Sequence, residues 1–108
     1  MGTTTASTRS DANPLYIIEQ DFGHLGHEIS GCPEATREMI VDQVRVQEHR
    51  GLTRIIELSP DGTWKDITRD IAADVYRQFY EERERPSWEM LGWLQNQGAA
   101  PDNLQAAE

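Results

Sequence analysis

The chain has 108 residues, with 19 aspartates and glutamates against 10 lysines and arginines, which gives a net charge of −9 at pH 7. This length supports one domain with a modest core, so we expect no catalytic machinery built from two domains. The charge opposes nonspecific contact with nucleic acid or an anionic membrane, and we interpret it first as a source of solubility.

Cysteine content and hydropathy predict a cytoplasmic protein. The single cysteine, Cys32, rules out an internal disulfide, and no apolar stretch approaches the roughly 20 residues that span a membrane. The first residues lack the basic and apolar pattern of a secretion signal. Nine arginines against one lysine favour a coding genome rich in G and C, as in many bacteria.

Both ends of the chain are predicted to be disordered tails. Residues 1–13 are rich in Thr, Ser and Ala, and residues 98–108 are mainly Ala, Gln, Asn and Pro. Neither end carries an apolar block that could join a core. Residues 14–97 are therefore the predicted folded domain.

The first predicted elements are a strand and a turn. Residues 15–22 are rich in branched and aromatic side chains and alternate toward the end of the run, which is typical of a strand. Two glycines within residues 23–27 predict a turn, after which residues 28–30 pair back on the first strand.

A helix is predicted from Pro33 to Arg50, ending at Gly51. Proline suits the first helical position, because the N–H that it lacks would be unpaired there anyway. The apolar residues of this helix form a broad stripe, so the helix should lie on a surface without being engulfed. They are Met39, Ile40, Val41, Val44 and Val46.

Two strands and a second helix follow. Residues 52–58 are a predicted strand, and the Ser-Pro-Asp-Gly sequence at 59–62 predicts a type I turn into a short strand at 63–65. Thr68 is the predicted N-cap of an amphipathic helix, with a hydrophobic staple between Ile67 and Ala72. Its apolar rows carry the predicted core. They contain Ile71, Ala72, Val75, Tyr76, Phe79 and Tyr80.

A short third helix completes the prediction. The charged run at 81–85 and Pro86 end the second helix, and Ser87 caps a last helix that reaches about Gln97. The predicted fold class is α+β. The short strands and tight turns favour a small antiparallel sheet of three to four strands, with two main helices on one face and a short C-terminal helix.

His24, His27 and Cys32 are residue types that bind metals and lie close together in the sequence, next to Asp21. Zinc commonly takes four such ligands, and the usual second pair of Cys or His is missing, so a solvated turn is the simpler interpretation. Cys32 also precedes the predicted helix, where the helix dipole would lower the pKa of its thiol, with His27 as a base. A metal- or thiol-dependent protein is therefore one alternative.

Acidic residues repeat at four-residue spacing along both main helices, in positions that could imitate a phosphate backbone. Arginines three residues after several of these acids favour ordinary ion pairs instead. An acidic inhibitor that mimics nucleic acid is a second alternative. The two rows are Glu34, Glu38 and Asp42, and Asp66, Asp70 and Asp74.

The C-terminal aromatic segment carries the leading functional hypothesis. Trp88, Met90, Trp93 and Leu94 are crowded into a helix too short to be stable alone in water. This segment either packs on the sheet or exposes an aromatic face to another chain. Since the common enzyme motifs are absent, we expect a non-enzymatic interaction or regulatory module with no cofactor. Its expected partner is another protein or a second copy, with no direct contact to nucleic acid or membrane.

Overall fold

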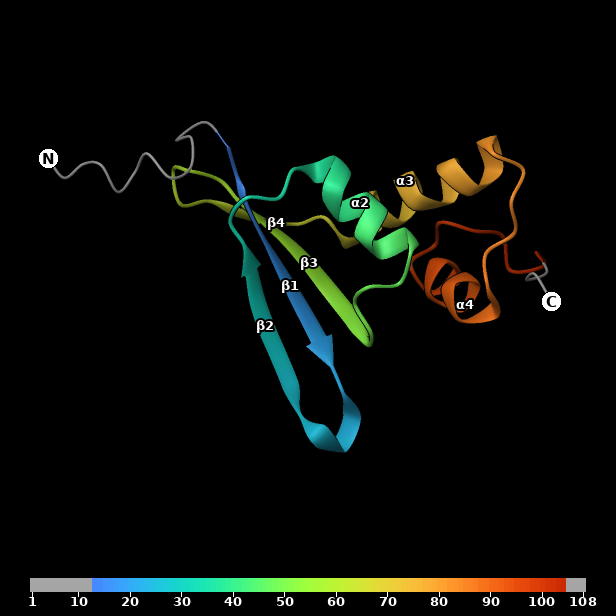
Figure 1. Cartoon of the computed structure of the whole chain (residues 1–108), viewed down its shortest axis with the longest axis horizontal. Helices are drawn as coiled ribbons and strands as arrows, with labels where there is room; N and C mark the ends of the chain where they lie inside the picture. The colour runs from blue at the N-terminus through green and yellow to red at the C-terminus, as the bar shows by residue number, and fades with distance from the viewer. Residues whose placement is uncertain (1–12, 105–108) are drawn as a thin grey trace, which may run out of the picture.

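The computed structural model describes residues 13–104, in which a four-stranded antiparallel sheet carries three helices (Figure 1). The strands are β1 (Leu15–Asp21), β2 (His27–Cys32), β3 (Leu52–Leu58) and β4 (Trp64–Asp66), and a short 3-10 helix, η1 (Gly23–Leu25), joins β1 to β2. The helices are α2 (Arg37–Arg45), α3 (Thr68–Glu81) and α4 (Trp88–Asn96). The predicted α+β class is confirmed. The predicted N-terminal tail, apart from Asn13, lies outside the described residues.

The sheet has the strand order β2-β1-β3-β4, and all three neighbouring pairs are antiparallel. Along β1 the buried residues alternate, with Tyr16, Ile18 and Gln20 on one face. Ile18 is paired with the buried Ile55 of β3, so both side chains point to the same side. The helices cover this side, while the β1–β2 hairpin reaches beyond them (Figure 1).

The core lies between the covered face of the sheet and the helices. The six largest of its side chains that are at most 1% exposed come from the sheet, from α2 to α4 and from the residue before α3. Burying a side chain of this size contributes about 1.5–3 kcal/mol relative to leaving it in water. These residues are Ile18, Ile40, Ile55, Ile67, Ile71 and Leu94.

The first main helix is shorter at both ends than the prediction of Pro33 to Arg50. Thr36 has extended backbone and its side chain accepts a hydrogen bond from the Met39 N–H, so it is the N-cap, and α2 begins at Arg37. The prediction of a helix start at Pro33 is wrong because β2 extends to Cys32, which pairs with Tyr16. The helix ends at Arg45, and Gln47 has a positive φ of 60°.

Thr68 joins α3 to the sheet, although the sequence predicted it as an N-cap. It is the first helical residue, and its buried hydroxyl accepts a hydrogen bond from the Ile55 N–H at 2.9 Å. The same hydroxyl donates to Asp66 Oδ1, which also accepts from the Thr68 N–H. The N-cap prediction is therefore wrong, since Asp66 receives the terminal N–H and Thr68 satisfies a donor of β3.

The packed part of the chain continues beyond Gln97, where the sequence predicted a tail. Ala100 is 7% exposed, and Leu104 packs against the core. Gln95 of α4 donates from Nε2 to the Pro101 carbonyl at 2.9 Å, which holds the segment in place. Residues 98–104 are therefore packed against the domain, because the Gln95 side chain of α4 pairs with their backbone, and the rest of the predicted tail, residues 105–108, lies outside the described residues.

Candidate groove beside the C-terminal helix

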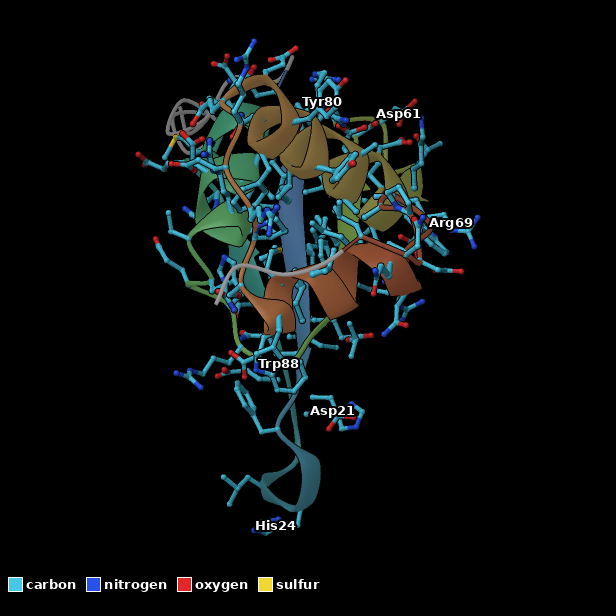
Figure 2. The ribbon with its side chains drawn as sticks, turned by 90° about the vertical axis from the view of Figure 1, so that its right-hand side faces the viewer. Asp21, His24, Asp61, Arg69, Tyr80 and Trp88 are labelled. Carbon is cyan, nitrogen blue, oxygen red and sulfur yellow. The ribbon has the colours of Figure 1, made fainter. Side chains whose placement is uncertain are left out.

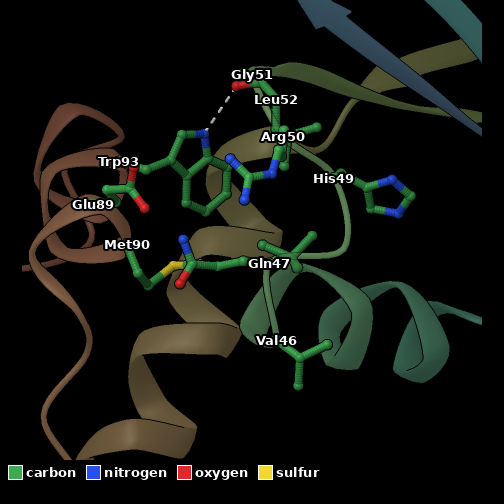
Figure 3. Close-up of a pocket in the computed structure, with 10 residues that line it drawn as sticks. Val46, Gln47, His49, Arg50, Gly51, Leu52, Glu89, Met90 and Trp93 are labelled. Carbon is green, nitrogen blue, oxygen red and sulfur yellow. Dashed lines mark hydrogen bonds between the residues drawn. The ribbon is translucent and has the colours of Figure 1, made fainter.

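A pocket of about 480 Å³ lies between α4 and the segment 46–51 that follows α2 (Figure 3). We call it the α4 groove. It contains apolar surface from both sides and polar groups from the 46–51 segment, an arrangement typical of binding sites. Its lining consists of Val44, Val46, Gln47, His49, Arg50, Gly51, Leu52, Glu89, Met90 and Trp93.

The 46–51 segment is held at both ends by hydrogen bonds to distant parts of the chain. The buried Gln20 side chain donates to the Arg50 carbonyl at 2.9 Å, and the Asp21 N–H donates to the Gly51 carbonyl at 2.8 Å. At the other end, the Ser87 hydroxyl donates to Gln47 Oε1 at 3.0 Å. One wall of the groove is therefore fixed to β1 and to the start of α4.

Ser87 also begins the helix that forms the opposite wall. Its hydroxyl accepts a hydrogen bond from the Met90 N–H, which confirms the predicted cap. The indole Nε1 of Trp93 donates to the Leu52 carbonyl at 3.2 Å, shown as a dashed line in Figure 3. This bond fixes the Trp93 ring as a preformed aromatic surface in the groove.

The four residues predicted to contact a partner are placed differently from one another. Met90 and Leu94 are buried in the core, at 5% and 0% exposure. Trp93 is half-buried and packs against the core, whereas Trp88 is 75% exposed. The helix therefore turns one side inward and leaves Trp88, with part of Trp93, exposed to solvent.

The rim of the groove combines apolar and charged side chains. Val46 is 67% exposed, and Arg50 and Glu89 bring one positive and one negative charge to the rim. Figure 3 shows the Arg50 guanidinium directed across the groove toward Trp93. The Nε2–H of His49 donates a hydrogen bond to Gln43 Oε1 at 2.9 Å, and burial lowers the pKa of the His49 imidazole. The neutral imidazole is thus favoured beside the groove.

Sequence reasoning missed most of this site. It assigned Val46, Gln47 and Arg50 to the first helix, where they would have continued a helical surface. Gly51 was the one residue in the sequence that could have indicated this irregular segment. A glycine can end an irregular segment as readily as a helix, so it did not decide between the two.

The three residues of the metal or thiol alternative are not brought together. His24 lies in η1 at the tip of the hairpin, and His27 begins β2 within 3.7 Å of Asp21 (Figure 2). Cys32 is at the other end of β2, five residues from His27, or about 16 Å along a strand. Its thiol is half-buried, and burial raises its pKa, opposite to the lowered value expected at a helix start.

The acidic rows are divided between several structures. Asp74 binds Arg37 and Arg77, each at 3.0 Å, so its charge is neutralised within the molecule. Asp66 belongs to β4 and accepts hydrogen bonds from Thr68, as described above. Glu38 and Asp42 are exposed on α2, while Glu34 precedes that helix. The two rows therefore do not form the continuous helical arrays that the spacing suggested.

In comparisons with known proteins, no family model matches this chain, and no curated protein or solved structure matches it significantly. Among residues 13–104, no helix combines the length and apolar character needed to cross a bilayer. Within the same part of the chain, no three His, Cys, Asp or Glu side chains are grouped so that they could hold a metal ion.

Proposed function

We propose that this protein is a non-enzymatic interaction module that binds another protein through the α4 groove. The observation that carries the proposal is the combination of a preformed pocket with exposed apolar side chains around it. Trp93 is fixed inside, Val46 extends the apolar surface outward, and the exposed Trp88 precedes the groove residue Glu89 on the same helix. Tryptophan is among the residues that most often dominate binding at protein interfaces.

A protein fits this surface better than a small molecule does. The pocket has room for an apolar side chain, Val46 offers an exposed apolar contact in its lining, and Trp88 is exposed at the start of the helix that forms one wall. Arg50 and Glu89 provide charges of both signs at the rim, which favours a partner with complementary polar residues around one apolar anchor.

The proposal is tested with Trp88→Ala and Val46→Glu. Both positions are exposed, so each change should alter the free energy of unfolding by less than about 0.5 kcal/mol. Trp88→Ala should weaken binding of the partner by about 2 kcal/mol or more, as for an interface anchor. The partner is first identified by co-purification from cells that encode the protein, and its affinity is then measured by titration calorimetry.

Trp64→Ala is the matched control, because Trp64 is 64% exposed but lies on β4, away from the groove. It should leave the affinity for the partner unchanged. Equal affinity of wild type, Trp88→Ala and Val46→Glu would contradict the groove as the binding site. Trp93→Ala is unsuited to this test, since loss of its packed ring and its hydrogen bond also lowers stability.

A further inference from the structure

The face of the sheet that the helices leave uncovered is apolar over much of its area. Since Tyr16, Ile18 and Ile55 point toward the helices, their neighbours along each strand point the other way. Ile29 and Trp64, on the two outer strands, are 66% and 64% exposed. The uncovered face contains Leu15, Ile17, Ile29, Gly31, Ile56, Leu58 and Trp64, together with Glu19, Arg54 and Asp66 and, at the hairpin end, Asp21 and His27.

The parts of this chain outside the described residues are poorly suited to cover this face. Residues 1–12 contain no Leu, Ile, Val, Phe or Trp, and residues 105–108 are Gln-Ala-Ala-Glu. A Thr- and Ser-rich segment gains little from contact with an apolar sheet. Leu104, which precedes the last four residues, packs against the core on the helical side. A surface from outside this chain is therefore the better cover.

We propose that a second copy of the chain covers the uncovered face, so that two sheets pack as a sandwich. The two-fold axis runs parallel to the strands, between β1 and β3, which are the central pair in the order β2-β1-β3-β4. This symmetry places β1 of each copy over β3 of the other, and β4 over β2. Aligned packing of this kind is common between antiparallel sheets.

The charges of the face complement each other under this symmetry. Glu19 and Arg54 are paired across β1 and β3, with Oε1 of Glu19 3.0 Å from Nε of Arg54. Rotation about the axis brings Arg54 of each copy over Glu19 of the other, so opposite charges meet twice. The net charge of −9 opposes association through acidic surfaces, whereas this pair contributes no net charge.

The strand register also determines what lies opposite Trp64. Trp64 lies at one edge of the face, and Gly31 at the opposite edge carries no side chain. A Cβ built at Gly31 would be in ordinary contact with Leu15 at 3.8 Å, so the Leu15 side chain lies beside this position. Because Trp64 is level with Leu58 and Leu15, the symmetry places it beside the Cys32 end of β2 in the other copy, while Asp66 comes level with Gly31. The central residues then meet as Leu15 with Leu58 and Ile17 with Ile56.

The size of the face predicts a weak dimer. Four strands of this length cover roughly 20 by 20 Å, so two copies bury on the order of 1,000 Å² together. This is near the lower end of specific interfaces, where weak and transient complexes are found.

Sedimentation equilibrium of the full chain, with two charge-reversal variants, tests the arrangement. Glu19→Arg and Arg54→Glu should each raise the dissociation constant at least about tenfold, because like charges then face each other. An equimolar mixture of the two variants should dimerise about as tightly as wild type, since two positive side chains of one copy then face two negative side chains of the other. Circular dichroism checks that each variant is folded.

Arg85→Glu is the matched control, because it changes the net charge as Arg54→Glu does but lies in the loop between α3 and α4. It should dimerise like wild type, and Trp64→Gln should dimerise more weakly. A wild-type chain that stays monomeric to about 1 mM overturns the proposal. So does a mixture that does not recover association, which would place any dimer contact elsewhere. Trp88→Ala leaves this dimer unchanged, so failure here is separate from failure of the proposed function.

Discussion

At the scale of single residues, Gly51 has the least room for a side chain among the described glycines. Its φ is 63°, and a Cβ placed there would lie 2.1 Å from the Asp21 carbonyl oxygen. Gly51→Ala should therefore lower the free energy of unfolding by about 3 kcal/mol or more, since the backbone of β1 or of the groove wall has to move. Urea denaturation measures this change.

Gly23 provides a control with a similar φ. Its φ is 68°, but a Cβ there meets nothing within 4 Å. Gly23→Ala should cost only the conformational term, about 1–2 kcal/mol. Equal losses for both variants would show that the contact between Gly51 and Asp21 does not constrain the 46–51 segment.

At the scale of elements, Arg45 connects the end of α2 to α3 and to the chain that follows it. Its guanidinium binds Glu82 and Glu84, each at 2.6 Å from Nη2, and lies 4.8 Å from the centre of the Phe79 ring. The hydrogen bond from Arg45 lowers the pKa of the Glu82 carboxyl. One planar side chain thus makes several contacts that a lysine could not make together.

Arg45→Lys should lower the free energy of unfolding by about 1–2 kcal/mol, because the ammonium group cannot bind both carboxylates and stack on the ring. Arg77→Lys is the control: Arg77 makes one ion pair with Asp74, and its side chain is 60% exposed. That change should cost less than about 0.5 kcal/mol in the same denaturation experiment. A comparable loss at both positions would contradict the special role of Arg45.

Elements defined by local sequence were predicted best. β3 has the predicted bounds of 52–58, and Ser87 caps the last helix as expected. The start of α2 was misplaced because both Pro33 and Thr36 suit a helix N-terminus, and the pairing of Cys32 with Tyr16 decides between them. That pairing joins residues far apart in the sequence, so no local pattern reveals it.

At the scale of the whole molecule, both proposed surfaces depend on contacts between distant segments. The α4 groove exists because Ser87 bonds to Gln47 and Trp93 to Leu52, each about forty positions apart. The crowding of Trp88 and Trp93 indicated the right helix, but only packing decides which side of it stays exposed. The uncovered face of the sheet likewise follows from the placing of all helices on one side.

Photo-crosslinking in cells that encode the protein tests whether the α4 groove binds a partner protein. A photoreactive phenylalanine analogue replaces Trp88 in one variant and Tyr80 in another, since Tyr80 is 74% exposed and lies far from Trp88 in Figure 2. We expect a discrete adduct with another protein from position 88, lost when Val46→Glu is added, and no such adduct from position 80. Absence of an adduct at position 88, or the same adduct from both positions, would contradict the α4 groove as a partner-binding site.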